Sequence, residues 1–138
     1  MSRSTQPVLA GVSPGAVTVV LTGDTAMKEA FVQQDPRRAF RDSNDFSPDD
    51  PPAQAAWTHY ALDWTAYLDW NGRGQLPPAE SERLPCIVNR AHALGRQVRF
   101  FNAPDRPEVW DAWIAHGADY LNTDELAAMN ARAQTVQP

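Results

Sequence analysis

The feature that most constrains the fold is a pattern that occurs twice in the last third of the chain. Each copy contains an amphipathic helix, a glycine, and then a short apolar stretch with a polar end. The copies read "AESERLPCIVNRAHALGRQVRFFN" and "RPEVWDAWIAHGADYLNT". Apolar residues at three- and four-residue steps predict a helix lying on a sheet, and the glycine ends that helix in a left-handed conformation. Parallel strands need such helical crossovers, so the pattern predicts a parallel α/β fold.

The remaining elements follow from the same reading of pattern and turn residues. We expect about five strands, over 16–23, 37–40, 57–64, 97–103 and 118–123. We expect helices over 26–33, 79–94, 106–116 and 124–134. The run "AVTVVLTG" lacks alternation, which predicts a strand buried on both faces. In the helix after it, Met27, Ala30 and Phe31 are expected on one face, behind a cap at Asp24 or Thr25.

The length and composition indicate one domain and exclude some partners. The 138 residues suit a single core, which we place at 16–133 between disordered segments 1–15 and 134–138. A net charge of −5 with no basic cluster argues against nucleic acid or an anionic membrane as partner. No stretch approaches the length of a membrane span or an uninterrupted signal peptide, so a cytoplasmic protein is the default expectation. The single cysteine, Cys86, has no metal-ligand spacing around it.

Polar residues stand at the predicted strand ends, where parallel α/β proteins bind ligands. Asn102 ends one strand, and Asn122, Thr123 and Asp124 end the next. Thr123 and Asp124 are equally well placed to cap the following helix, which would need no function.

Arg99 and three tryptophans are further candidates. Arg99 and Phe101 share a face of a strand that should be apolar, so Arg99 needs a carboxylate, a backbone carbonyl or an anionic ligand as partner. The candidate partners within the chain are Asp42, Asp63 and Asp124. Asp63 and Trp64 are candidates for lining a groove, and Trp70, Gly72 and Gly74 for its rim. Alternatively, Trp57, Trp64 and Trp70 are packing residues.

The segment "AHALGRQVRFFNAPDRPEVWDAWIAHGADYLNTDEL" resembles the carboxyl-terminal signature of the phospholipase C-like phosphodiesterases. It is most similar to the branch related to altered-inheritance-of-mitochondria protein six. The resemblance extends upstream through "VTVVLTG", "RRAFRDS" and "WNGRGQLPPAE", and it covers Val17 to Met129. It implies the carboxyl-terminal half of a (β/α) barrel of the TIM type, with Phe101 where the family usually has tryptophan.

The resemblance also implies a function, the hydrolysis of a phosphodiester, either glycerophosphodiester or phosphoinositide-like. The family's paired histidines do not match His59, His92 or His116, so no catalytic residue is assigned. The expected substrate-binding residues are listed together: Arg99, Asp63, Trp64, Phe101, Asn122 and Asp124. No cofactor is expected within this chain, and a divalent metal such as Ca²⁺ or Mg²⁺ belongs to the complete barrel.

Half of a barrel leaves strand edges unpaired, so we expect a homodimer or association with a missing amino-terminal half. Two alternatives remain open. One is a non-catalytic binding or assembly module that retains the half-barrel. The other is a fragment of a glycoside hydrolase-like barrel, because paired rim carboxylates would suit that reaction.

Overall fold

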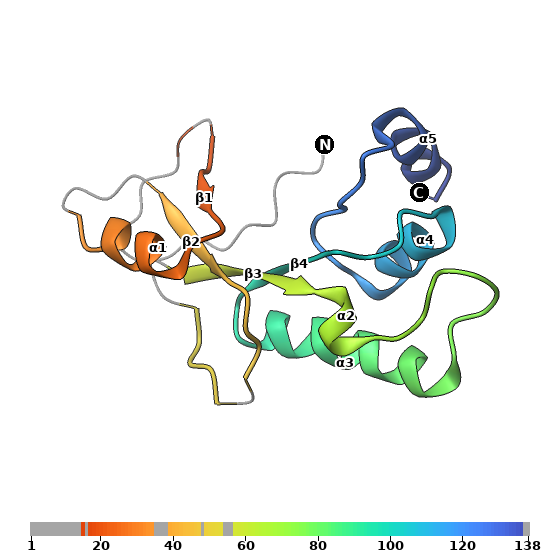
Figure 1. The fold of residues 1–138 in the computed structure, drawn as a ribbon, viewed down its shortest axis with the longest axis horizontal. Helices are drawn as coiled ribbons and strands as arrows, with labels where there is room; N and C mark the ends of the chain where they lie inside the picture. The colour runs from red at the N-terminus through yellow and green to blue at the C-terminus, as the bar shows by residue number, and fades with distance from the viewer. Residues whose placement is uncertain (1–14, 16, 35–38, 48, 54–56, 137–138) are drawn as a thin grey trace.

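A computed structural model describes residue 15 and the ranges 17–34, 39–47, 49–53 and 57–136. These residues form a parallel sheet with helices packed against it (Figure 1). The strands are β1 (Val20–Leu21), β2 (Phe40–Ser43), β3 (Trp57–Asp63) and β4 (Gln97–Phe101). The helices are α1 (Thr25–Val32), α2 (Trp64–Tyr67), α3 (Pro78–Ala93), α4 (Pro107–His116) and α5 (Leu126–Val136). The predicted α/β class is confirmed.

Within the described residues the sheet has four strands in the order β1-β2-β3-β4, and every pairing is parallel. Each strand therefore lies beside the strand that precedes it in the sequence. The longest pairing joins β3 to β4, from His59 opposite Gln97 to Asp63 opposite Phe101. The shortest joins β1 to β2 and includes only two residue pairs.

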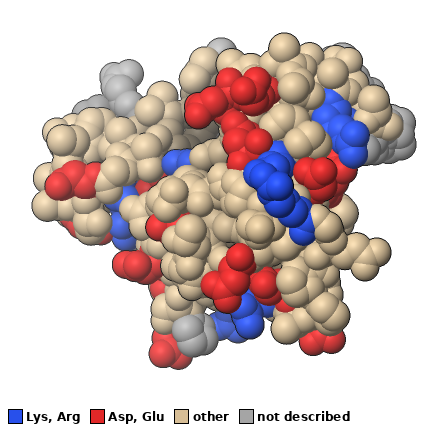
Figure 2. Space-filling model, turned by 45° about the vertical axis from the view of Figure 1, so that its right-hand side comes forward, with Lys and Arg blue, Asp and Glu red and all other residues tan. Residues whose placement is uncertain are grey.

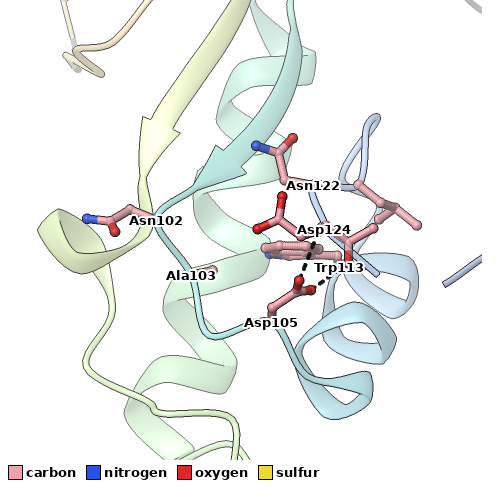
Figure 3. Close-up of a pocket in the computed structure, with 8 residues that line it drawn as sticks. Asn102, Ala103, Asp105, Trp113, Asn122 and Asp124 are labelled. Atoms are coloured by element: carbon pink, nitrogen blue, oxygen red, sulfur yellow. Dashed lines mark hydrogen bonds between the residues drawn. The ribbon is translucent and has the colours of Figure 1, made fainter. Parts of the chain in front are cut away.

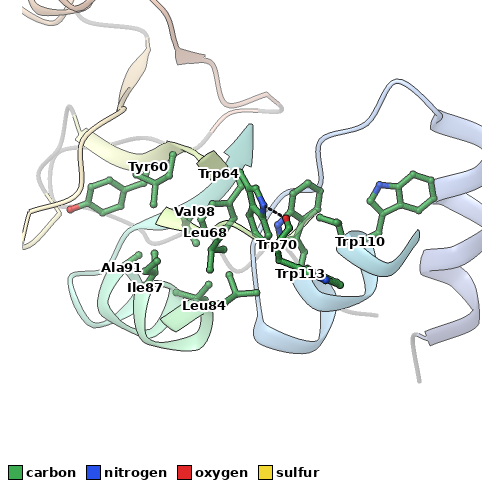
Figure 4. Packing of buried hydrophobic residues seen from close by; sticks show 14 of the residues in the cluster. Tyr60, Trp64, Leu68, Trp70, Leu84, Ile87, Ala91, Val98, Trp110 and Trp113 are labelled. Carbon is green, nitrogen blue, oxygen red and sulfur yellow. Dashed lines mark hydrogen bonds between the residues drawn. The ribbon is translucent and has the colours of Figure 1, made fainter. Parts of the chain in front are cut away.

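One face of the sheet carries the hydrophobic core (Figure 4). Successive side chains of a strand point to opposite faces of the sheet. The core face receives Tyr60 and Leu62 from β3, and Val98 and Phe100 from β4. The predicted stripe of α3 packs on them through Leu84, Ile87, Val88 and Ala91. From α4, Val109, Trp110 and Trp113 complete the core. These positions confirm most of the predicted buried stripes, whereas Leu94 and Ile114, which were also predicted on them, are only half-buried.

The predicted signals at the helix ends are also observed. Asp24 is the N-cap of α1, where its carboxylate accepts a hydrogen bond from the Met27 amide at 2.8 Å. Pro77 and Pro78 begin α3, and Gly95 and Gly117 adopt positive φ angles of 75° and 83° after α3 and α4. Glycine reaches this conformation without the steric cost that a side chain imposes.

The predicted strand over 118–123 is wrong. Only the start of this segment follows β4, where the Asp119 amide donates to the Val98 carbonyl at 2.9 Å. The Asp119 carboxylate then accepts from the Val98 amide at 2.8 Å, so a side chain occupies the position of the next ladder partner. Because a side chain replaces the backbone acceptor, the segment leaves the sheet and becomes a loop.

The first predicted strand and helix differ from the structure in burial. β1 is limited to Val20–Leu21, and the preceding Val17 and Val19 are 77% and 50% exposed. A strand buried on both faces is therefore not found there, because β1 lies at the edge of the described sheet. In α1, Met27 and Ala30 are exposed, Lys28 is buried and Phe31 is half-buried, so the covered face is shifted from the predicted one.

The remaining predicted boundaries lie partly outside the described residues. The predicted strand 37–40 overlaps β2 only at Phe40, and residues 37 and 38 lie outside the described ranges. The predicted disordered segment 1–15 lies outside them except for Gly15, as do the last two residues of the tail. Helix α5 continues to Val136, into the predicted tail. Among the described residues, no helix is long and apolar enough to cross a membrane.

Candidate functional site

A pocket of about 410 Å³ opens where β4 ends and where the segment after α4 returns to it (Figure 3). Its walls come from two connections, the one between β4 and α4 and the one between α4 and α5. The lining residues are Asn102, Ala103, Asp105, Trp113, Leu121, Asn122, Thr123 and Asp124. The polar triplet 122–124 and Asn102, both predicted at strand ends, meet at one site, although the triplet lies in a loop.

Asn102 joins the ends of the two longest strands. It has a φ angle of 58°, a left-handed conformation that non-glycine residues seldom adopt. Asparagine is among the few that tolerate it, because its short polar side chain can bond locally. Its amide nitrogen donates to the Asp63 carboxylate at 3.4 Å, which links the end of β4 to the end of β3.

Asp63 has a structural task at this edge. Its Oδ1 accepts from the amide and the hydroxyl of Thr65, at 3.0 and 2.8 Å, and thereby caps α2. The hydrogen bond from the Thr65 hydroxyl is the main cause that lowers the pKa of Asp63. The carboxylate is therefore ionised and oriented at the carboxyl edge of the sheet, as the sequence predicts for a rim residue.

Asp105 organises the pocket. Its carboxylate accepts hydrogen bonds from the Trp110 indole at 3.0 Å, the Thr123 hydroxyl at 2.7 Å and the Asp124 amide at 2.9 Å. Partial burial opposes ionisation of Asp105, but the hydrogen bonds from Thr123, Asp124 and Trp110 prevail and lower its pKa. The carboxylate thus fastens the returning segment to the β4–α4 connection (Figure 3).

Thr123 has the local role that its sequence position allows. Its hydroxyl accepts from the Glu125 amide at 2.8 Å, immediately before α5 begins at Leu126. The Asp124 carboxylate has no hydrogen-bond partner among the described residues, and neither has the Asn122 side chain. The triplet therefore combines one capping hydroxyl with two side chains that remain open to a ligand.

Arg99 lies on the sheet face opposite the core, and it is 28% exposed. Its guanidinium approaches the Asp42 carboxylate at 3.9 Å and donates to the Thr22 hydroxyl at 3.3 Å. Of the three predicted carboxylate partners, the structure brings Asp42 to Arg99. Asp42 makes a closer pair with the buried Lys28, at 2.7 Å.

Arg96, rather than Arg99, is the fully buried arginine. It is 1% exposed, and its guanidinium stacks on the Trp57 ring at 3.5 Å from the ring centroid. It also donates to the Tyr60 hydroxyl at 2.8 Å, and that hydroxyl donates to Asp50. Burial is the main cause that raises the pKa of Tyr60 to about 12. This network fixes the end of the sheet opposite the pocket.

Trp64 and Phe101 differ in their availability to a ligand. Trp64 is buried in the core, edge-on to Phe100 and Trp113, with its indole bonded to the Trp70 carbonyl at 3.2 Å. Trp64 is therefore a packing residue, the alternative to lining a groove. Phe101 is half-buried at the end of β4. Neither of them lines the pocket.

The three histidines do not line the pocket either. His59 is buried in β3, its Nδ1 lies 2.5 Å from the Thr58 hydroxyl, and burial lowers its pKa. His92 on α3 contacts the Asp119 carboxylate at 2.8 Å, and His116 is in the last turn of α4. The described residues contain no group of three or more His, Cys, Asp or Glu side chains that could hold a metal ion.

Four of the lining residues were not predicted as site residues: Ala103, Asp105, Trp113 and Leu121. Asp105 follows β4 by four residues, and a carboxylate in a strand-to-helix connection is a signal that could have found it. Trp113 falls on the buried stripe of α4, and no sequence signal separates a pocket wall from the core there.

On the face drawn in Figure 2, Lys and Arg side chains alternate with Asp and Glu and do not gather into one basic patch.

No protein-family model matches this chain, and no curated protein or solved structure matches it either. The class of protein that the structure defines is therefore the parallel α/β class, with a polar pocket at the carboxyl edge of the sheet.

Proposed function

We propose that the described residues form consecutive β/α units of a phosphodiesterase barrel of the phospholipase C-like kind. The observation that carries the proposal is the strand order, in which each parallel strand lies beside its predecessor. That order is characteristic of a (β/α) barrel, whereas a doubly wound sheet reverses its order at a switch point. The resemblance in sequence supports the same assignment.

The substrate in this proposal is a phosphodiester, either glycerophosphodiester or phosphoinositide-like. Arg99 would bind its phosphate, because it lies on the face that a closed barrel turns inward and is not fully buried. Its contact to Asp42 is long, and its planar guanidinium has several donors that suit phosphate oxygens. The pocket at the end of β4 lies on the same carboxyl edge of the sheet and would hold the alcohol part of the substrate.

In this proposal, neither Arg99 nor the pocket at the end of β4 transfers the protons. Phosphodiester hydrolysis needs a general base and a general acid that reach the reacting oxygens. None of the three histidines lines the pocket, and the buried His59 has a lowered pKa. We therefore expect binding of a phosphodiester without turnover by the chain alone, and turnover only in a complete barrel.

The test is to titrate the chain with glycerophosphoinositol and, separately, to assay hydrolysis of bis(p-nitrophenyl) phosphate. We expect no turnover, and we expect Arg99→Ala to weaken binding about tenfold, the effect of losing a hydrogen bond to a charged group. Arg73→Ala is the matched control, because Arg73 is exposed and distant in sequence from the site. Turnover that Arg99→Ala abolishes would show that the chain is itself catalytic. Absence of binding would refute the phosphodiester assignment.

A second candidate, a non-catalytic binding or assembly module, is favoured by the Lys28–Asp42 pair. Because Asp42 shares the face of Arg99, this pair brings a side chain of α1 onto the face that a barrel would enclose. A sheet covered there by its own helix would not close into a barrel. Sedimentation velocity separates the candidates, since a stable dimer without affinity for the phosphodiester would support the module.

A further inference from the structure

The two outer strands of the described sheet differ in what occupies their free edges. At β4 the segment after α4 covers the edge at Val98. The Asp119 amide donates there to the Val98 carbonyl at 2.9 Å, and the Asp119 carboxylate accepts from the Val98 amide at 2.8 Å. The same carboxylate oxygen contacts the His92 ring at 2.8 Å, which ties this segment to α3. A strand from another molecule cannot pair with β4 at this point without displacing Asp119.

The edge at β1 has no such cover among the described residues. There β1 is the first strand of the sheet, and it pairs with β2 on one side (Figure 1). The Val19 carbonyl accepts from the Phe40 amide at 2.9 Å, so it faces β2. Because the peptide groups of neighbouring residues in a strand point in opposite directions, the Val20 N–H and C=O face away from β2. Unpaired backbone groups along an outer strand are a template for another strand.

The side chains at this edge are uncharged and mostly apolar. From Val17 to Gly23 the sequence reads "VTVVLTG". Val17 and Val19 are 77% and 50% exposed, although valine is among the residues most often buried. Proteins commonly protect an outer strand against pairing with a lysine, a proline or an inward-pointing charge. The stretch 17–23 contains none of these, so this edge is not protected against pairing.

The charged side chains next to the edge have partners within the chain. Lys28 of α1 pairs with Asp42 at 2.7 Å, and Arg41 of β2 pairs with Glu29 at 3.0 Å. Neither cation is therefore left to select an acidic partner. The Asp24 carboxylate, which follows β1, caps α1. A strand without charge fits this edge best, and the chain itself contains one.

We propose that two copies of this chain associate through β1, as antiparallel strands related by a two-fold axis near Val19 and Val20. Each strand then meets the same stretch of its partner, so apolar and threonine side chains face each other along the pairing. The Val20 backbone groups gain partners, and the exposed valines of one copy are covered by those of the other. Because Asp119 occupies the edge of β4, the association stops at two copies and does not extend into a filament.

This inference deepens the second candidate function, the assembly module, and rests on it, since it names the partner and the surface. It differs from the closure of a barrel by two halves, in which β1 of one copy pairs with the last strand of the other. That closure needs a free edge at β4, which Asp119 occupies at Val98. A dimer that forms elsewhere would refute the β1 surface alone, whereas a monomeric chain would refute the surface and the assembly module together.

The experiment is sedimentation velocity of the full chain from low to high micromolar concentration, with charge variants at Val19. We expect the unchanged chain to form a dimer. Val19→Lys and Val19→Glu should each weaken the association at least about tenfold, because like charges then lie close together across the axis. An equimolar mixture of the two variants should restore it, since Lys then meets Glu. Met27→Lys, the same change at an exposed position of α1, should leave it unchanged.

Amide hydrogen exchange of the unchanged chain is a second measurement, which does not depend on how the variants fold. Protection of the Val20 amide should rise with protein concentration, whereas the Leu21 amide, which faces β2, should depend on concentration less.

Four results would overturn the inference. They are a monomer at every concentration, a dimer that neither variant at Val19 weakens, and a mixture of the two variants that stays monomeric. The fourth is a Val20 amide that is protected in a monomer, which would show that another part of the same chain covers the edge.

Discussion

The two halves of the sheet are held together by different physical means. The half that contains β3 and β4 rests on an apolar core, in which Tyr60, Leu62, Val98 and Phe100 are at most 1% exposed. Among the described residues, the half that contains β1 and β2 contributes no member to this core cluster. There the fully buried contact is an ion pair, Lys28 with Asp42. Burial of a residue therefore depends less on its own hydrophobicity than on whether neighbouring elements cover it.

Val19 and Val98 show why two similar apolar residues differ in burial. Both valines belong to short apolar runs with a glycine nearby, and the sequence predicts buried strands for both. Val98 lies in the core over α3 and is 0% exposed, whereas Val19 stands at the edge of the described sheet and is 50% exposed. Hydrophobic burial stabilises in proportion to the area removed from water, so only Val98 contributes fully.

The largest expected effect is in the apolar half. Phe100 contacts the Trp64 and Trp113 rings, at centroid distances of 5.4 and 6.5 Å. Phe100→Ala should lower the free energy of unfolding by about 4 kcal/mol, since it removes buried area and leaves a cavity. Urea denaturation followed by tryptophan fluorescence measures this loss. Met27→Ala, at an exposed position of the other half, should change the stability by less than about 0.5 kcal/mol.

A somewhat smaller effect is expected from the buried ion pair. Lys28→Met should lower the free energy of unfolding by about 3 kcal/mol, because it leaves the buried Asp42 carboxylate without its close cation and with only the longer contact to Arg99. Hydrogen exchange should show the loss in β1, α1 and β2, with β3 and β4 less affected. The control is Glu29→Gln, which breaks the partly exposed pair with Arg41 and should cost less than about 1 kcal/mol. Equal effects of the two variants would contradict the contrast between the halves.

The smallest effect concerns Asp105, a mostly exposed carboxylate, and it appears as a dependence on pH. Its pKa is lower in the folded protein than in the unfolded chain, so its contribution is fully present above the unfolded value of about 3.9. The contribution is lost as the pH falls through the lower, folded pKa. In that window the hydrogen bonds from Thr123 and Asp124 are released, and the fluorescence of Trp110, which donates to Asp105, should change.

Asp105→Asn should reduce this acid transition at the pocket, while Asp49→Asn, at another exposed aspartate, should preserve it. Both variants are followed by fluorescence through the same acid titration. An unaltered transition in Asp105→Asn would mean that other carboxylates hold the returning segment.

Much of the fold can be predicted because the signals are local. The helices that end at Gly95 and Gly117, the capping residue Asp24 and the prolines before α3 act on their immediate neighbours. The parallel sheet follows from the helix–strand alternation. Local signals could not predict that residues 118–123 form no strand. The Asp119 side chain competes with backbone pairing only when β4 lies beside it.

The site is predictable in part for the same reason. Asn102 and the triplet at 122–124 do line one pocket, but the rule that parallel strands end together applies only to Asn102, because the triplet lies in a loop and not at a strand end. The partner of Arg99 remained a choice among three aspartates, and Asp105 was missed. Pairings between residues so far apart in the chain leave no periodic trace in the sequence.

The sequence by itself determined the α/β class, the amphipathic faces of α3 and α4 and the caps, because each depends on residues within a few turns of one another. The tertiary structure alone decided that Asp42 pairs with Lys28 and approaches Arg99, and that Asp105 closes the pocket wall. Such contacts depend on which elements become neighbours. The packing of the whole core and the pairing of all the strands together decide which elements become neighbours.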